Sequence, residues 1–326
     1  MDLVFSYRQL PAWCREPERE IAFHQEQLAR AEACKEGVKT KHALALREEA
    51  GDIFIEGDGF TVIFDRIHGR LKQYLAGEEV MIADGLGFNI WRAPVDNDGK
   101  VRKLWESAMV HHMCHVVESV SLEEKEDAVT ITCSQIYAPI VMEWKILLRT
   151  VYTIDGQGEV TIDLKGIPTG TLPESFPRIG MRFILESGME RISWYGRGPL
   201  ETYPDCKEGN PIGIYEKTAE EFYFPYVVPQ ETGNREDTRY VKILKENGNG
   251  ICITGEKPFG FSALHYSQED LTKAAHTNEL HRTEQIYLNL DYKQNGLGSA
   301  SWGPEVLEKD QLKPEPFQMK WKINRV

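Results

Sequence analysis

Three glutamates and three histidines are the residues whose types could carry acid–base chemistry in this chain. The carboxylates are Glu201, Glu231 and Glu305, and two of them facing each other could act as general acid and general base. Their spacing does not indicate that any two do face each other. The histidines are His265, His276 and His281. No serine or cysteine nucleophile motif accompanies them, so acid–base chemistry here would depend on the fold joining distant positions.

A second group has the residue types of a metal site. The stretch VHHMCHVV contains His111, His112, Cys114 and His115. On a strand only alternate residues share a face, which pairs His112 with Cys114 and His111 with His115. Two ligands do not complete a zinc site. We therefore predict a half-buried strand with surplus histidines and no metal, and no phosphate-binding or dinucleotide fingerprint is present either.

Four stretches combine aromatic side chains, glycine or proline, and hydrogen-bonding groups. They are residues 92–99, 194–209, 224–240 and 295–305. Such mixtures are typical of sugar sites, where aromatic faces pack on C–H groups and polar side chains satisfy hydroxyls. They are also typical of long, packed loops of a β-sandwich. Composition alone leaves both interpretations open.

The first of these stretches lies within IWRAPVDNDG, residues 90–99. Pro94 fixes one backbone dihedral and biases the preceding residue towards an extended conformation. Asp96, Asn97 and Asp98 can each hydrogen-bond their own backbone, and Gly99 frees the chain direction. The pattern predicts a rigid polar loop that leaves a buried strand.

The elements that must position these loops are mostly short strands. From residue 52 onward, runs rich in Val, Ile, Thr, Phe and Tyr alternate with turns, as in the expected hairpins at residues 52–65 and 151–164. Only residues 100–108 and 267–276 have helical character. We therefore predict an all-β protein, a large antiparallel two-sheet sandwich over residues 51–326. Residues 1–28 contain two further extended stretches, and residues 29–50 form a polar linker with some helical tendency.

Composition excludes several classes of function. The chain has 326 residues, with 38 Lys and Arg against 51 Asp and Glu, which gives a net charge of −13. This balance argues against nucleic-acid and anionic-membrane partners. No apolar run has the length of a membrane span, and no signal peptide is visible. The six cysteines are scattered, which is typical of free thiols in the cytoplasm: Cys14, Cys34, Cys114, Cys133, Cys206 and Cys252.

Taken together, the four stretches resemble a known family. The motifs WRAPxDND, WxGxGPxExYxD, YxxPQExGxRxxxR and GxGSxSWGP begin at Trp91, Trp194, Tyr226 and Gly296. They occur in this order in the C-terminal domain of family 2 β-galactosidases. The resemblance extends from about residue 52 to the end. It implies a super-sandwich like that of galactose mutarotases, and residues 1–28 look like the end of the immunoglobulin-like domain that precedes it in those enzymes.

The resemblance also implies that the catalytic residues lie elsewhere. In the family, two glutamates on a TIM barrel perform retaining hydrolysis. This chain lacks an alternating βα pattern and is too short for that barrel as well. We therefore expect no catalytic residue here and no hydrolysis by the chain alone. The partners implied are the barrel portion, a β-galactoside such as lactose and a homo-oligomer, with Mg and Na bound in the barrel; the partial preceding domain favours an excised fragment over a separate subunit.

The resemblance further assigns roles to residues of the motifs. Trp302, between glycines and a proline, is expected to project outward from the surface and stack on the galactoside. The rim of the pocket is expected at Asp96, Asn97, Asp98 and Gly99. Salt bridges between Arg92 and the aspartates, together with turn hydrogen bonds, are expected to brace this rim, and a mobile segment is expected from Lys100 onward. The residues expected to tie the loops together by charge-assisted hydrogen bonds are Arg92, Glu201, Glu231 and Arg239.

Two other functions remain open at this point. An autonomous aldose 1-epimerase on the same fold would need a general acid and a general base, for which His265 with Glu231 or Glu305 can be proposed. A non-catalytic carbohydrate-binding module would need only the sugar-binding loops. Anomer interconversion and galactose binding by the pure chain would distinguish these two from the leading interpretation.

Overall fold

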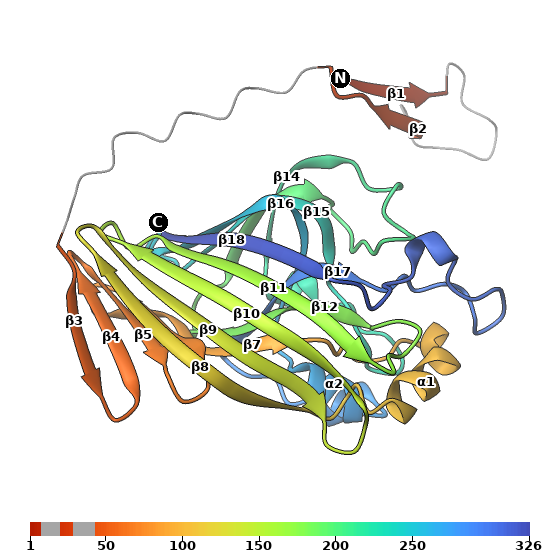
Figure 1. Cartoon of the computed structure of the whole chain (residues 1–326). Coiled ribbons are helices and arrows are strands. Elements are labelled where there is room, and N and C mark those ends of the chain that lie inside the picture. The colour runs from red at the N-terminus through yellow and green to blue at the C-terminus, as the bar shows by residue number, and fades with distance from the viewer. Residues whose placement is uncertain (8–19, 29–42) are drawn as a thin grey trace. The chain divides into compact units, whose positions relative to one another are not determined.

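A computed structural model describes residues 1–7, 20–28 and 43–326 of the chain (Figure 1). The chain divides into two units, Met1–Lys39 and Thr40–Val326. In the first unit, β1 (Asp2–Ser6) pairs with β2 (Glu20–Gln25) in antiparallel fashion. The two extended stretches are thus confirmed, whereas their origin in an immunoglobulin-like domain stays a prediction. Residues 8–19, and 29–42 of the predicted linker, lie outside the described residues, as do Cys14 and Cys34.

The second unit is built almost entirely of strands. They are β3 (Ala45–Glu49), β4 (Asp52–Gly57), β5 (Phe60–Asp65), β6 (Arg70–Ala76), β7 (Glu79–Asn89), β8 (Met113–Lys125), β9 (Ala128–Pro139), β10 (Trp144–Asp155), β11 (Val160–Gly170), β12 (Arg178–Leu185), β13 (Arg191–Arg197), β14 (Ile212–Thr218), β15 (Arg235–Leu244), β16 (Gly250–Leu264), β17 (Ile286–Gln294) and β18 (Phe317–Arg325). The helices are α1 (Val101–Ser107) and α2 (Gln268–Lys273), with short 3-10 turns at Asp96–Gly99, Glu220–Phe222, Thr277–Glu279 and Glu308–Asp310. The predicted strand-rich organisation and both predicted helices are confirmed. Among the described residues, no helix is long and apolar enough to span a bilayer.

Strand β3 corrects the predicted boundary of the linker. Residues 45–49 were expected in the linker that ends at residue 50, but they pair with β4, Ala45 opposite Glu56 and Glu49 opposite Asp52. The guanidinium of Arg47 lies 3.8 Å from the ring centroid of Phe54 on that neighbour. Cross-strand pairing therefore recruits this charged segment as an edge strand despite its helix-compatible composition.

Hydrogen bonds connect all sixteen strands of this unit into one antiparallel sheet. Its main order is β3-β4-β5-β6-β7-β12-β17-β16-β18-β11-β10-β9-β8, and β13, β14 and β15 branch from β16. The sheet curls so that β9 to β11 pack over β5 to β7: Phe64 meets Tyr152, and Phe88 meets Tyr137, each with ring centroids 5.1 Å apart. The antiparallel sandwich predicted from the sequence is confirmed, with its two layers formed by one continuous sheet.

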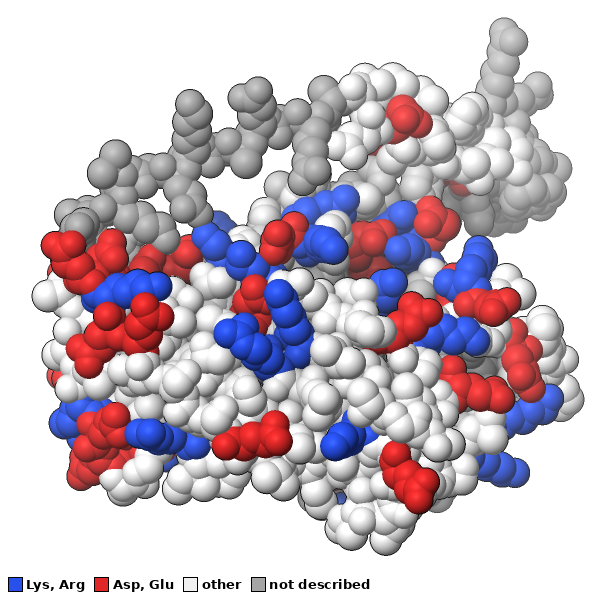
Figure 2. All heavy atoms as spheres, viewed as in Figure 1, with Lys and Arg blue, Asp and Glu red and all other residues white. Residues whose placement is uncertain are grey.

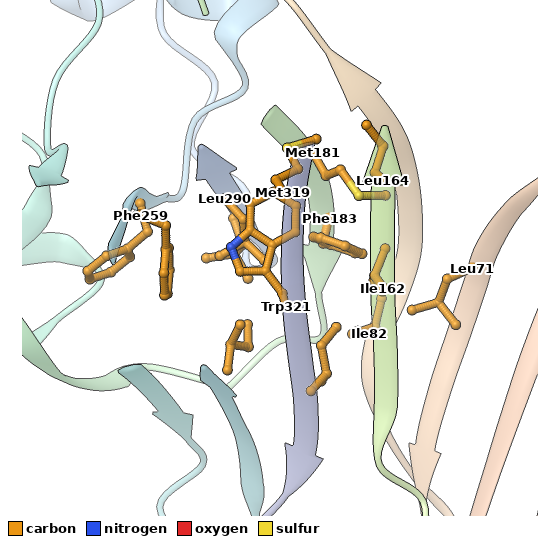
Figure 3. Packing of buried hydrophobic residues seen from close by; sticks show 14 of the residues in the cluster. Leu71, Ile82, Ile162, Leu164, Met181, Phe183, Phe259, Leu290, Met319 and Trp321 are labelled. Carbon is orange, nitrogen blue, oxygen red and sulfur yellow. The ribbon is translucent and has the colours of Figure 1, made fainter. Parts of the chain in front are cut away.

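The core between the layers follows the alternation of the strands. Along β9 and β10 every second side chain is buried, including Ile131 and Ile146. Figure 3 shows Trp321 of β18 among Phe183, Met181 and Met319, with Phe259 nearby. Inward apolar and outward polar residues at period two are what a half-buried antiparallel sheet requires.

Candidate functional site

The order of the strands brings the first and last of the four stretches to one edge of the sheet. Strands β7 and β17 both pair in antiparallel fashion with β12, so they run parallel to each other. Their C-terminal ends, Asn89 and Gln294, therefore lie at the same edge, each opposite the start of β12. Residues 90–99 and 295–305 leave these ends and meet there although about 200 residues separate them.

A buried ion pair joins these two loops. Arg92 and Asp98 are both 0% exposed, and the Arg92 Nη2 lies 2.8 Å from Asp98 Oδ1. Arg92 also donates to the carbonyl oxygens of Asn295 and Gly296, the latter at 3.2 Å. The placement of Arg92 agrees with its expected structural role. The expected salt bridge between Arg92 and these aspartates is present at Asp98. The expected substrate contact by Asp98 is wrong, because its carboxylate is buried and held by Arg92.

The other predicted rim residues lie at the surface. Asp96 and Gly99 are exposed and Asn97 is half-buried. The backbone N–H of Asp96 donates to Gln230 Oε1 (3.1 Å), and Gln230 Nε2 donates to Asp96 Oδ2 (3.2 Å), which links the first and third stretches. Asn97 Nδ2 donates to the carbonyl of Gly298 (2.8 Å). Substrate contact by Asp96, Asn97 and Gly99 stays a prediction.

Trp302 projects fully into solvent, with a relative exposure of 101%. The backbone N–H of Trp302 donates to the carbonyl of Ser299 (3.0 Å), which closes a turn at the loop tip. At the base of the loop, both carboxylate oxygens of Asp205 accept backbone N–H groups, from Leu297 (2.9 Å) and Gly298 (2.7 Å). The outward position of the indole agrees with the prediction, while stacking on a sugar stays a proposal.

Asp205 is a positioning residue that the sequence reasoning did not single out. It ends the second motif, and its partners lie more than 90 positions later in the chain. Its place as the last polar residue of a motif was the only available signal. Together with Asn97, it holds the Trp302 loop from two sides.

Glu201 of the second stretch and Glu231 of the third stretch both hold the third stretch in place. Glu201 accepts from the Thr232 hydroxyl (3.0 Å), from the Gly233 N–H (2.8 Å) and from the Tyr226 hydroxyl. Glu231 is buried and lies 2.5 Å from the Arg178 guanidinium. Both placements agree with the expected role of tying loops together.

Arg178 is a second residue that sequence reasoning missed. It is fully buried and pairs with Asp291 (Nε to Oδ1, 3.0 Å) as well as with Glu231. Burial disfavours the charged guanidinium, but the carboxylates of Asp291 and Glu231 outweigh this and raise the pKa of Arg178. Only the fold brings together these partners from β12, β17 and the third stretch.

Arg239 departs from its predicted role. Its guanidinium donates to the backbone carbonyl of Asp237 and lies 5.3 Å from the ring centroid of Tyr195. The Asp237 carboxylate instead accepts from Arg197 (2.9 Å) and Lys207 (3.0 Å) of the second stretch. The link between the second and third stretches therefore uses other cations than the predicted one, because β15 turns the Arg239 side chain onto the face of Tyr195.

Glu236 adds an unusual carboxyl group near these links. Part of the residue reaches the surface, but its Oε1 accepts a hydrogen bond from the buried side chain of Asn234 (2.9 Å). Burial of the carboxyl group raises the pKa of Glu236 to about 7, although Lys207 and Asn234 work in the opposite direction. This group changes its protonation in the neutral pH range.

The candidate acid–base residues belong to separate networks. His265 is buried between Glu190 (Nε2 to Oε2, 3.1 Å) and the Gln285 carbonyl (Nδ1 to O, 3.3 Å). Glu231 contacts Arg178, and Glu305 contacts Lys100 at the surface. The remaining histidines form local surface pairs, His276 with Glu279 and His281 with Asp270. In the described structure, His265 therefore forms no hydrogen-bonded acid–base pair with Glu231 or with Glu305.

The histidine-rich stretch does not assemble a metal site. His111 and His112 precede β8, and their rings are tilted against each other with centroids 4.0 Å apart. His115 stacks on Tyr137 at 5.2 Å. Within residues 1–7, 20–28 and 43–326, no group of three or more His, Cys, Asp or Glu side chains could hold a metal ion. The alternation expected on one strand was wrong for the first two histidines, because they lie in the turn before it.

The segment from Lys100 onward is helix α1 rather than a loose cover. Its Trp105 is fully buried and donates from Nε1 to the Ser175 hydroxyl (3.1 Å). Between α1 and the Trp302 loop lies a cavity of about 80 Å³ lined by Asn97, Lys100 and Glu305 among others. Small-molecule pockets usually measure about 300–1,000 Å³, so this cavity alone is too small for a complete small-molecule site. A larger cavity of about 520 Å³, lined by Phe259, Trp321 and other residues of β15 to β18, does not include Trp302.

Comparisons with known proteins bear on the identity of the chain. The family model described as "Beta galactosidase small chain" matches residues 56–323. A β-galactosidase of Priestia megaterium is 31% identical over 290 residues, and one of Kluyveromyces lactis is 31% identical over 279 residues. The alignments cover 87% and 83% of this chain but only 27% of each relative, so the chain spans about a quarter of their length. A β-galactosidase of Halalkalibacterium halodurans aligns with 99% of this chain at 29% identity, over 32% of its own length.

Solved structures give weaker similarities. Galactose 1-epimerase of Lactobacillus acidophilus is 9% identical with a TM-score of 0.43, covering 88% of this chain and 99% of that one. An aldose epimerase homologue of C. elegans is 8% identical with a TM-score of 0.46, covering 87% and 99%. Scores below 0.5 do not establish a shared fold, so the architecture rests on the observed sheet.

Proposed function

The chain belongs to the β-galactosidase small chain family, and from this premise we propose that it completes the galactoside pocket of a family 2 β-galactosidase. The two catalytic glutamates of that enzyme would lie on a TIM barrel outside this chain and perform retaining hydrolysis. The chain itself would contribute binding and assembly, and no catalytic group.

The exposed indole of Trp302 is the observation that carries the proposal. A tryptophan normally buries much of its large apolar surface, so one held fully outward on a braced loop favours a partner that covers it. Asp205 and Asn97 hold that loop, and the adjoining cavity is too small for a complete sugar site. A platform and a rim without a deep pocket support a site completed by another part of the enzyme.

Several finer features belong to the same proposal. The substrate would be a β-galactoside such as lactose, and the compartment would be the cytoplasm. Mg and Na would bind in the barrel portion, and a homo-oligomer would be compatible with the assembly. The four cysteines in the described part of the chain are free thiols, which is compatible with a reducing compartment.

The proposal can be tested by complementation with the barrel-containing part of the same enzyme. The pure chain should not hydrolyse a nitrophenyl β-galactoside, because it supplies no barrel glutamates. The barrel-containing part alone should be weakly active, and mixing the two should increase hydrolysis. Robust turnover by the chain alone, or no gain on mixing, would contradict the proposal. Rapid interconversion of galactose anomers by the chain would instead favour the epimerase. Tight binding of galactose by the chain alone would favour a carbohydrate-binding module.

A further inference from the structure

The turn between β9 and β10 has an unusual composition. It contains Ile140 and Val141, which are 78% and 73% exposed. Turns usually contain Gly, Asn, Asp, Ser or Pro, as the β4–β5 turn at Gly57-Asp58-Gly59 does here. Two branched aliphatic side chains exposed to water at a turn do not stabilise this chain by itself, because their apolar surface is not buried.

These side chains continue an apolar surface that reaches the Trp302 loop. A cavity of about 250 Å³ beside the turn is lined by Leu104 of α1, Met142, Leu172 and Glu174 among others. The small cavity beneath the Trp302 loop is also lined by Leu104 and Glu174. Leu104 is itself 50% exposed. One surface therefore runs from the Trp302 loop across α1 to the β9–β10 turn, at the end of the sheet where Figure 1 shows α1.

The rim of this surface is polar. Lys100 pairs with Glu305 at its Trp302 end, and Arg102 pairs with Glu106 on the outer side of α1 (2.7 Å). An apolar centre with charged pairs around it is the usual composition of a protein interface. By contrast, the outer face of the sheet seen in Figure 2 has blue side chains over the middle of β10 and β11, where Arg149 stands directly opposite Lys165. Apolar exposure and charge are thus distributed differently over the molecule.

We propose that the surface formed by Leu104, Ile140, Val141, Met142 and Leu172, here called the α1 surface, docks the barrel-containing part of the same β-galactosidase. The inference rests on the proposed function. Continuity with the Trp302 loop selects this occupant, since a partner that covers the indole also lies over α1. The relatives are more than three times longer than their match to this chain, which leaves a large part of those enzymes to fill the role. The matching partner surface should be apolar and uncharged at its centre.

The test measures association separately from substrate binding. The chain and the barrel-containing part are mixed, and the dissociation constant is measured by sedimentation velocity. The double variant Ile140→Asp, Val141→Asp should weaken association at least tenfold, because two charges would be buried without partners. A second double variant, Ile140→Ser, Val141→Ser, should weaken it in the same direction and suits the turn. Both should unfold at nearly the temperature of the wild-type chain.

The matched control is Ile214→Asp, at a residue that is 71% exposed on β14. It should leave association unchanged. The α1 surface is not the docking site if the double variants associate as tightly as the wild-type chain, or if Ile214→Asp weakens association as much as the double variants do. The proposed function stands in either case. If the wild-type chain does not associate at all, both proposals fail. If the double variants instead dissociate a dimer of the chain itself, a second copy is the occupant and the inference is overturned.

Discussion

Two regions of the second unit are held together by different forces. One is the strand body, the sheet with its core between the layers; the other is the loop end, formed by residues 90–99, 194–209, 224–240 and 295–305. In the strand body, alternating apolar side chains such as Ile131 and Ile146 fill the space between the layers. At the loop end, the largest buried side chains include three arginines: Arg92, Arg178 and Arg235. The first two pair with buried carboxylates, and Arg235 donates to the carbonyls of Gly233 and Asn234.

The difference follows from what each backbone leaves unsatisfied. Strands in a sheet pair their own N–H and C=O groups, so their side chains need only pack. Irregular loops do not, and Arg92 therefore donates to the carbonyls of Asn295 and Gly296 while Asp205 accepts the N–H groups of Leu297 and Gly298. The loop conformation here depends on charged groups with a required orientation. Loss of a single one of these groups should therefore disrupt it.

Removal of one buried charge at the loop end should have the largest effect. Asp98→Ala leaves Arg92 buried without its carboxylate, which should lower the free energy of unfolding by about 3–5 kcal/mol. Urea unfolding of the isolated chain measures this. Asp96→Ala, at an exposed carboxylate two positions earlier, is the control and should cost less than about 1 kcal/mol. Equal losses for the two variants would show that burial of the charge pair does not set the stability of the loop end.

Glu236 makes the stability of the loop end depend on pH. Folding raises the pKa of its carboxyl group from 4.5 to about 7, so the folded protein binds the proton more tightly than the unfolded chain. The contribution of this group is therefore fully present below about pH 4.5, declines as the pH rises to 7, and stays lost above that. The total change should not exceed roughly 3.4 kcal/mol, the equivalent of this pKa difference.

The variant Glu236→Gln isolates this contribution. Relative to the wild-type chain, it should gain stability between pH 5 and pH 8 in urea unfolding, because the amide does not ionise. Glu124→Gln, at an exposed position on β8, should show no such gain. A difference between Glu236→Gln and the wild-type chain that does not vary with pH would show that the carboxyl group is not buried as described.

Trp302 tests whether the loop end has a role besides its own stability. Trp302→Ala in the assembled enzyme should raise KM by roughly 30-fold, corresponding to about 2 kcal/mol for one lost apolar contact surface. The melting temperature of the isolated chain should stay nearly unchanged because the indole is fully exposed. Unchanged kinetics, or a chain that no longer folds, would favour a structural role.

A small change in the strand body should have the smallest effect. Ile131→Val removes one buried methylene group from β9 and should cost about 0.5–1.5 kcal/mol in urea unfolding. The partly exposed Ile136→Val on the outer face of the same strand should cost less. If Ile131→Val cost as much as Asp98→Ala, packing in the body would be as exacting as charge pairing in the loops.

The strand body was predictable because its signals are local. The hairpins around Gly57-Asp58-Gly59 and Asp155-Gly156 combine period-two alternation with turn residues, and both are confirmed. Strand β3 was missed because its sequence, ALREE, suits a helix, and only pairing with β4 makes it extended. Where a strand depends on its partner, its own composition does not reveal it.

The loop end was predictable only in part. The glycines around Trp302 indicated an outward indole, in agreement with the structure. A salt bridge between Arg92 and the aspartates that follow it was expected, and the pair with Asp98 confirms it, but the sequence did not reveal that this pair is fully buried. Arg178 and Asp205 were missed because their partners lie 53 and more than 90 positions away, distances at which spacing carries no information.

Strand β18 has a consequence for how the protein is made. It lies inside the sheet, with Val160 of β11 opposite Ile323 on one side and Ile251 of β16 opposite Arg325 on the other. A nascent chain that has not yet released residues 317–325 from the ribosome leaves β11 and β16 as open edges. These edges stay unpaired until β18 is made, which is more than 60 residues after Ile251. We expect the growing chain to need protection from β-aggregation during this interval, for example by a chaperone that covers exposed strands.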